Sequence, residues 1–197
     1  MTYATPRASL GHVIDIEALR VQPDLAGEKV VLTQLDESHL DDSWASLQDQ
    51  EVTRFTGTHA TFTYEQIRKW NASRPGLTDR ADWAILRAED RAYVGDAALT
   101  NVDADNASAS FRIALSTAAE FGRGYGTEAT RLLLDYAFDV VGLHRVQLEV
   151  FDFNTRARRV YEKCGFVAEG VQREALRWDG AWHDVILMAV LASDRRG

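Results

Sequence analysis

Apolar residues recur at helical spacing directly after a cluster of glycines in the second half of the chain. Between residues 129 and 140 they are separated alternately by three positions and by one, in a pattern that places them on one face of a helix. Residues 109–115 read as a strand that runs into the same cluster. The pattern predicts a strand, a glycine loop and a long helix, whose buried face is formed by Ala129, Leu132, Leu133, Tyr136, Ala137 and Val140.

Shorter patterns divide the remaining chain into strands and helices. Asp36 and Thr63 are predicted N-caps, and the helices that they begin run to residues 48 and 73, with a loop containing Gly57 and His59 between them. Gly142 is expected to close the long helix. The predicted strands are 29–35, 82–89, 92–101, 108–115, 144–151, 166–171 and 185–191, and a last helix is predicted at 155–163.

The glycine loop, residues 121–129, has the composition of a phosphate-binding segment. Gly122, Gly124 and Gly126 let the backbone approach a ligand closely, because they carry no Cβ and tolerate positive φ. The helix after the loop adds unpaired N–H groups and the positive end of its dipole. A plain turn would explain the glycines, but it would not explain a strong helix that begins among them.

Composition and charge narrow the functional classes. The chain has 197 residues, of which 46% are hydrophobic and 26% charged, as in a globular domain. Twenty-two basic and thirty acidic residues give a net charge of −8, which argues against a nucleic-acid surface and favours a cationic substrate. No run of 18 apolar residues is present, so the sequence predicts no membrane span.

The termini and the single cysteine bear on location. Cys164 excludes an internal disulfide framework and a cysteine-cluster metal site, and it fits a reducing cytoplasm. Residues 1–27 lack a basic start followed by an apolar run, so we expect no signal peptide there. We expect them to form an irregular arm with a helical turn at 13–20, followed by one domain at 28–197.

Two interpretations of the glycine loop compete. The segment from Gly124 to Ala129 satisfies the G-x-G-x-x-A form of the dinucleotide fingerprint, and Asp152 closes the next strand where a ribose-binding acid would lie. Against this interpretation, a dinucleotide fold begins with its glycine loop, whereas here an antiparallel meander comes first. In addition, little chain remains after Lys163 for further βαβ units.

The second interpretation depends on the segment after the long helix and its next strand. Residues 154–166 (NTRARRVYEKCGF) resemble motif B of the GNAT acetyltransferases, and the glycine loop with its helix resembles motif A. The resemblance spans residues 30–191, and the closing segments 177–180 and 183–188 resemble the ribosomal-protein-alanine N-acetyltransferase branch. One position departs from the usual [Q/R]-x-x-G-x-[G/A] loop, because Phe121 stands where Gln or Arg is common. Binding should survive if backbone N–H groups are the main phosphate ligands.

This resemblance implies a fold and a reaction. The fold would be α/β, with a mixed central sheet, an antiparallel N-terminal meander, splayed strands at the cofactor site and flanking helices. The reaction would transfer an acetyl or longer acyl group from acyl-CoA to an amine, by direct attack in a ternary complex, in a monomer or homodimer without a metal. The residues implied for acetyl-CoA are Ile113, Ala114, Leu115, Phe121, Gly122, Arg123, Gly124, Tyr125, Gly126, Thr127, Asn154 and Arg158.

Tyr161 and Glu149 are the implied catalytic residues. A phenol, with a pKa near 10, can protonate a departing thiolate, whose pKa is near 8.5. The alternative for Tyr161 is a core tyrosine, and Asn154 is equally well placed as an N-cap of the next helix. Glu149 could act as a base through water, although its side chain could equally face a helix. No carboxylate lies between Asp105 and Glu120, which favours an α-amine acceptor that needs little help from a base.

Three classes of function therefore remain from the sequence. The first is an N-acetyltransferase whose acceptor is a protein or peptide N-terminus, or else a small amine such as a polyamine or an amine antibiotic. The second is a nicotinamide-dependent oxidoreductase. The third is an acyl-CoA-binding module without catalysis. Cofactor binding and an amine panel would distinguish them.

Overall fold

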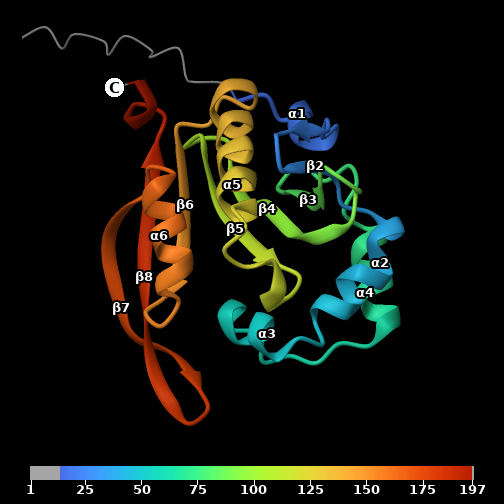
Figure 1. Cartoon of the computed structure of the whole chain (residues 1–197). Coiled ribbons are helices and arrows are strands. Elements are labelled where there is room, and N and C mark those ends of the chain that lie inside the picture. The colour runs from blue at the N-terminus through green and yellow to red at the C-terminus, as the bar shows by residue number, and fades with distance from the viewer. Residues whose placement is uncertain (1–13, 197) are drawn as a thin grey trace, which may run out of the picture.

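One eight-stranded sheet carries the fold in the computed structural model, which describes residues 14–196 (Figure 1). The strands lie in the order β1-β2-β3-β4-β5-β6-β8-β7, and every neighbouring pair is antiparallel except β5 with β6. This is the mixed sheet with an antiparallel meander that the sequence predicts. The strands are β1 (Leu25–Ala26), β2 (Val30–Gln34), β3 (Ala81–Arg87), β4 (Tyr93–Asp103), β5 (Ser108–Leu115), β6 (Arg145–Phe151), β7 (Val167–Trp178) and β8 (Ala181–Leu191).

The parallel pair β5–β6 separates after three residues. Ser108, Ala109 and Ser110 face Arg145, Val146 and Gln147 in register, and the pairing ends there. Residues 111–115 remain paired to β4 on one side only. The predicted splay is therefore confirmed, and it opens an unpaired strand edge inside the sheet.

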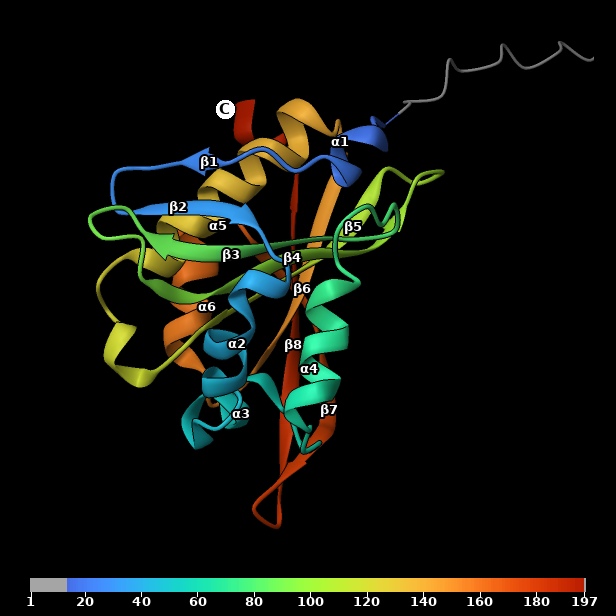
Figure 2. The ribbon, with the colours of Figure 1, turned by 90° about the vertical axis from the view of Figure 1, so that its right-hand side faces the viewer.

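Helices cover both faces of the sheet (Figure 2). The helices α5 (Tyr125–Asp135) and α6 (Thr155–Lys163) pack on one face, over a core that includes Trp83, Leu99 and Val146. The opposite face carries α2 (Leu40–Ser46), α3 (Gln50–Thr56) and α4 (Tyr64–Ala72), with a smaller cluster around Leu35 and Leu86. Alternate residues of β3 enter the two cores, as the period of a strand requires.

The buried face of α5 ends earlier than the sequence predicts. Ala129, Leu133 and Ala137 are fully buried, but Val140 is 52% exposed. A π-helical turn, Tyr136–Val140, continues α5, and the N–H of Val141 bonds to the carbonyl of Tyr136. This wider turn shifts the register by one residue, so that Val141 enters the core instead of Val140.

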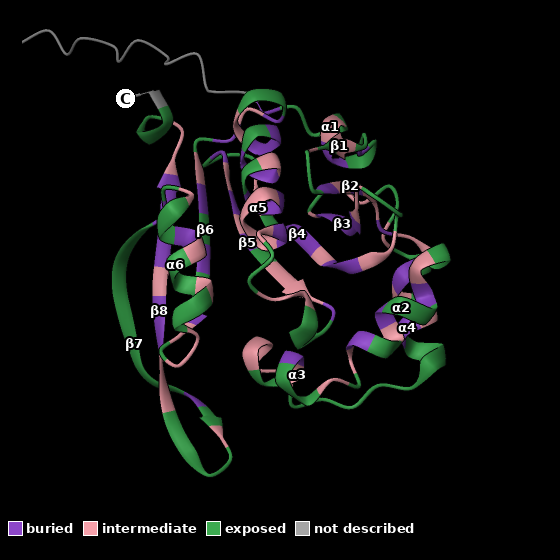
Figure 3. Ribbon diagram, in the orientation of Figure 1, coloured by how far each residue is buried: buried purple, intermediate pink, exposed green. Residues whose placement is uncertain are grey.

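Three segments differ from the expectations. The segment after residue 48 contains α3, a helix that the sequence pattern does not predict, and the region 37–48 begins as a 3₁₀ turn, Glu37–His39. The strands β7 and β8 extend to a tight turn at residues 179–180 and form a long hairpin. The β7 strand is exposed over most of its length (Figure 3). Exposure on both faces removes the alternation by which a strand is recognised.

Part of the expected N-terminal arm packs against the domain. Residues 1–13 lie outside the described chain. Beyond them, α1 (Glu17–Arg20) falls within the predicted helical turn, β1 pairs with β2, and Ile14 and Leu19 are buried in the main core. The boundary at residue 27 stays a prediction.

Candidate active site

The splay between β5 and β6 holds a cleft of about 690 Å³. Its walls come from the glycine loop, the free edge of β5, the end of β6, the first turns of α6, and α3. Arg123 and Arg158 do not line it. The sequence-predicted site residues that do line it are Ile113, Ala114, Leu115, Phe121, Gly122, Gly124, Tyr125, Gly126, Thr127, Glu149, Asn154 and Tyr161.

The glycine loop turns its backbone toward this cleft. Gly122 and Gly124 have φ values of +77° and +92°, a region in which a Cβ is strained. Gly124 is the N-cap of α5 and provides no side-chain cap, and the first intrahelical bond runs from the N–H of Glu128 to its carbonyl. The N–H groups of the first turn are therefore available to an anion, and the helix dipole has its positive end there.

Glu128 fixes the loop to the start of β2. Its carboxylate accepts hydrogen bonds from the backbone N–H groups of Glu28, Lys29 and Val30, at 3.1, 2.7 and 2.8 Å. Lys29 in turn donates from Nζ to the carbonyl of Arg123, at 3.2 Å. These contacts hold the glycine loop in place before any ligand binds.

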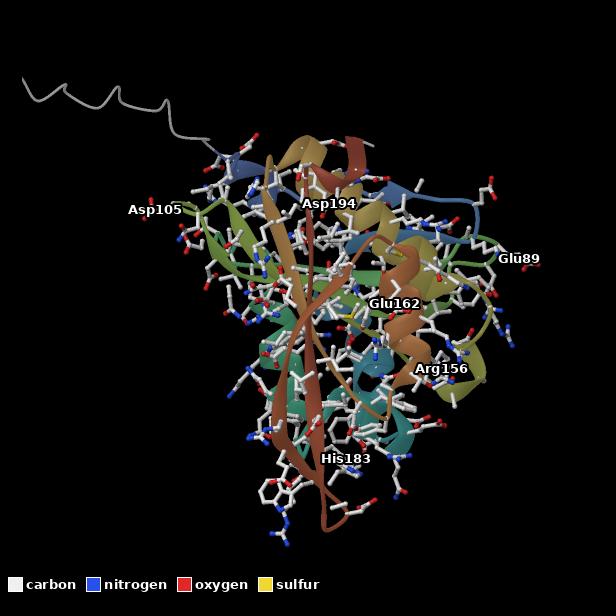
Figure 4. The ribbon with its side chains drawn as sticks, turned by 90° about the vertical axis from the view of Figure 1, so that its left-hand side faces the viewer. Glu89, Asp105, Arg156, Glu162, His183 and Asp194 are labelled. Atoms are coloured by element: carbon white, nitrogen blue, oxygen red, sulfur yellow. The ribbon has the colours of Figure 1, made fainter. Side chains whose placement is uncertain are left out.

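An aromatic bridge connects α3 to the glycine loop. The ring of Phe55 contacts the rings of Phe121 and Phe153, each at 6.1 Å between centroids. Arg156 lies at the start of α6 (Figure 4), and its guanidinium lies over the ring of Phe121. The helix α3 thus covers the cleft beside the loop, and Arg156 places a cation next to the position where Gln or Arg is common.

Asn154 performs the capping role that the sequence allows. Its Oδ1 accepts from the N–H of Ala157 at 3.2 Å, which fixes the first turn of α6. The side chain also lines the cleft, so the two expected roles are compatible. Arg158, one turn further, pairs with Glu162 at 2.9 Å and lies outside the cleft lining; its role in binding stays an expectation.

Tyr161 lies at the inner end of the cleft, where it is 7% exposed. Its ring packs edge-on against Phe111 and Phe166. Burial raises the pKa of the Tyr161 phenol above its usual value, and the nearby Cys164 adds to the effect. No group among residues 14–196 hydrogen-bonds its hydroxyl. The proton is therefore retained at neutral pH and is not committed to a neighbour.

Glu149 and Asp152 leave the strand β6 in different directions. Leu148 and Val150 enter the main core, so the exposed Glu149 lies on the opposite face of the sheet from them. The cleft therefore connects the two faces. Asp152 accepts from the N–H of Asp184 and lies 3.3 Å from Nδ1 of His183, a residue of β8 that is labelled in Figure 4. Asp152 does not line the cleft beside the glycine loop, where a ribose-binding acid would lie.

Cys164 is structural in this arrangement. Burial raises the pKa of its thiol, and Sγ donates to the carbonyl of Thr127 at 3.7 Å, which connects α6 to α5. A thiol in that state is a poor nucleophile. Within the described part of the chain, no three His, Cys, Asp or Glu side chains converge as metal ligands would, and no helix is long and apolar enough to cross a bilayer.

Comparison with known families gives one match over most of the chain. Residues 29–167 match the model described as an acetyltransferase (GNAT) domain. A spermidine N-acetyltransferase from Vibrio cholerae, solved in complex with CoA and spermine, has a TM-score of 0.80 at 22% identity, over 87% of this chain and 100% of that chain. At 22% identity, this similarity shows only that the two chains share a fold.

Curated relatives are more similar in sequence but only over part of their length. The spermidine N(1)-acetyltransferase of Vibrio cholerae is 33% identical over 109 residues, which are 55% of this chain and 62% of that protein. YdaF of Bacillus subtilis, provisionally named as a ribosomal N-acetyltransferase, is 35% identical over 109 residues, which are 55% of this chain and 58% of that protein. The matches thus span about three fifths of these relatives.

Proposed function

This chain belongs to the GNAT acetyltransferase family, and we propose that it transfers an acetyl group from acetyl-CoA to a primary amine. The observation that carries the proposal is the cleft itself. It joins the free N–H groups at the start of α5 to the unpaired edge of β5, and it is also lined by Tyr161, a largely buried residue.

The residues of the cleft fit the parts of coenzyme A. A diphosphate is suited to the N–H groups of residues 122–127, with Lys29 and Arg156 as nearby cations. The amides of pantetheine are suited to the edge of Ile113, Ala114 and Leu115, which would pair with them as with an added strand. The space in front of Gly126 is open, since a Cβ there would meet only Leu115, at 4.0 Å.

When bound, acetyl-CoA supplies an activated acyl group: the amine nitrogen forms a bond to the acyl carbon, the carbon–sulfur bond breaks, and the sulfur takes up a proton. Tyr161 would donate that proton, because its phenol is protonated and its hydroxyl is free to turn. A phenol with a raised pKa is a weaker acid, so the donation would accompany bond breaking rather than precede it. The unpaired N–H groups of β5 could polarise the acyl carbonyl.

The names of two relatives support two classes of acceptor. One relative is named for spermidine and another, provisionally, for ribosomal N-acetylation, so we consider both a small amine and an amine of a protein or peptide. The strand that enters the cleft carries no carboxylate between Asp105 and Glu120, so a base for a strongly basic amine has to come from another element.

Turnover assays test the proposal directly. The full chain is mixed with acetyl-CoA and each amine of a panel, and free thiol is measured, while calorimetry measures the affinity for acetyl-CoA. Saturable binding with amine-dependent thiol release supports an acetyltransferase. Binding without release from any amine would indicate a non-catalytic module, and the absence of binding would contradict the whole proposal.

A further inference from the structure

A second cavity, of about 450 Å³, adjoins the cleft on the opposite side of the sheet. It lies between β4, β5 and the helices α2, α3 and α4, and its mouth includes Phe62. The two cavities share wall residues and therefore adjoin one another. The shared residues are Val52, Thr56, Arg112 and Ala114.

The walls of this second cavity are mainly apolar, formed by Leu47, Val52, Phe62, Ile67 and Trp70. Its neutral polar groups are largely engaged with one another. The hydroxyls of Thr56 and Thr58 bond at 2.7 Å. The Oε1 of Gln66 accepts from the N–H of Thr63 at 2.7 Å, and Oγ of Ser43 accepts from Asn71 at 3.2 Å.

Asp96 and Arg112 are the charged residues in the lining. Asp96 faces Ala114 in the β4–β5 register, and side chains of residues that face one another in this way lie side by side on one face of a sheet. Ala114 lines both cavities, whereas Asp96 lines the second cavity alone, so the carboxylate of Asp96 lies beside a residue of the shared wall. Arg112 Nη2 is 3.4 Å from Oδ1 of Asp96, and the Tyr93 hydroxyl is 3.5 Å from Oδ2.

This charge pattern discriminates between amines. The Asp96–Arg112 pair is close to neutral, and the remaining walls offer no second carboxylate. A polyamine placed here would leave its other ammonium groups without partners among apolar side chains, which disfavours its binding. A single amine attached to an apolar group would place that group against the walls and its nitrogen beside Asp96.

We propose that this second cavity holds the acceptor, that the acceptor is a primary monoamine carrying an apolar group, and that Asp96 takes the proton which the amine loses. The proposal rests on the acetyltransferase function above. In this step the amine nitrogen forms a bond to the acyl carbon and the carbon–sulfur bond breaks. The proton of the amine passes to a carboxylate oxygen of Asp96, and the leaving sulfur receives the proton of Tyr161. The amine can belong to a small molecule or to a peptide N-terminus with an apolar first residue.

The electrostatics of Asp96 agree with this role. Burial raises the pKa of Asp96 above its usual value, and Asp82 adds to the rise, whereas Arg112, Tyr93 and Arg80 oppose it. A carboxylate with a raised pKa is a stronger base. The sequence does not reveal Asp96 as a base, because its position beside Ala114 is set by the register of two strands.

The acceptor class is tested with three amines at equal concentration: 2-phenylethylamine, a tripeptide with an N-terminal phenylalanine, and spermidine. We expect kcat/KM to be at least about tenfold higher for one of the first two than for spermidine. Phe62 is 40% exposed, and Phe62→Ala should lower the ratio of kcat/KM for the preferred amine to kcat/KM for spermidine. The control is Val140→Ala, which truncates an exposed apolar side chain in the π-helical turn after α5. A preference for spermidine that Phe62→Ala leaves intact would overturn the acceptor assignment.

The base is tested with Asp96→Asn and Glu149→Gln. We expect Asp96→Asn to lower kcat by roughly 10²–10⁴-fold while the affinity for acetyl-CoA changes less than about twofold. Asp105→Asn, in the distant β4–β5 turn, is the charge control (Figure 4). A larger loss for Glu149→Gln than for Asp96→Asn would overturn the assignment of the base. If no amine is turned over by the unmodified chain, the acetyltransferase function itself fails, which is a distinguishable result.

Discussion

The guanidinium carbon of Arg156 lies 3.7 Å from the centre of the Phe121 ring. Arg156 also lines the cleft, so a cation from α6 takes the place next to the glycine loop where a side chain of the loop itself is more usual. Phe121 holds that cation in position through its ring face. The departure of Phe121 from the common loop pattern is thus accompanied by a charge from another element.

Arg156→Ala should therefore weaken acetyl-CoA binding. A charged hydrogen bond contributes about 1.5–3 kcal/mol, which corresponds to a roughly 10- to 100-fold increase in Kd by calorimetry. Arg158→Ala, two residues away and paired with Glu162, tests the sequence-predicted binding role of Arg158 and should raise Kd less, because Arg158 does not line the cleft. An equal loss of affinity for acetyl-CoA in both variants would mean that the arginines of α6 attract the cofactor through their general positive charge and that Arg156 makes no specific contact.

Gly126→Glu should abolish binding while the fold remains. Gly126 has ordinary helical geometry and open space beside it, so a side chain is accommodated and gains helix propensity. A carboxylate at the anion site costs several kcal/mol, so Kd should rise by at least about 100-fold. Gly126→Ala measures the effect of size alone. Gly124→Ala, at positive φ, should lower the free energy of unfolding by about 1–2 kcal/mol in addition.

Tyr161→Phe separates catalysis from packing. If Tyr161 donates the proton, kcat should fall by roughly 10²–10⁴-fold with KM for acetyl-CoA little changed. The thermal midpoint should hold, because no hydrogen bond of the hydroxyl is lost among the described residues. A normal rate would remove Tyr161 from the mechanism and leave water as the proton source.

The raised pKa of Tyr161 also predicts a pH dependence. An unperturbed phenol would produce a basic limb in the rate profile near pH 10. Burial moves the pKa of Tyr161 upward, so this limb should be absent below about pH 10. The pKa of Tyr161 is higher in the folded chain than in the unfolded chain. The contribution of Tyr161 to the free energy of unfolding is therefore complete below the unfolded pKa and is lost as the pH rises toward the folded pKa. This loss is measured by comparing the thermal midpoints of the unmodified chain and of Tyr161→Phe across alkaline pH.

Glu128→Ala should loosen the glycine loop from β2. Its loss leaves three backbone N–H groups without their acceptor, which lowers the free energy of unfolding by about 1–3 kcal/mol. Denaturant unfolding measures the change. Glu162→Ala, which breaks an exposed helical pair, is the control and should cost under about 0.5 kcal/mol. If the two variants are equally stable, the contacts of Glu128 contribute nothing net.

Local signals predicted some elements closely. The helix α6 spans Thr155–Lys163 as expected, because its N-cap and closing glycine are local. The family resemblance drawn from the two motifs is confirmed by the family match. In contrast, α3 (Gln50–Thr56) has local caps in Asp49 and Gly57 but buries only Val52, so it lacks the apolar periodicity by which a helix is recognised. Its Phe55 contacts rings more than sixty positions away.

The candidate site shows the same division. The sequence predicted the residues of the glycine loop and Tyr161 as site residues, since they belong to continuous motifs, and all of the predicted loop residues except Arg123 line the cleft with Tyr161. It did not identify Asp96 or Arg156, because their positions depend on strand register and on the approach of α6 to the loop. Long-range geometry of this kind has no local sequence signature.

The edge of β5 opened by the splay has a consequence for aggregation. An exposed strand edge is a template on which another chain can add. In this molecule residues 111–115 carry such an edge, and it lies within the cleft, whose other walls come from β6, α6, α3 and the glycine loop. We expect these walls to obstruct an added polypeptide strand with its side chains more than a slender ligand that carries amides. The unpaired edge of β5 is therefore expected to be accessible to a ligand in the cleft and protected from strand addition by other proteins.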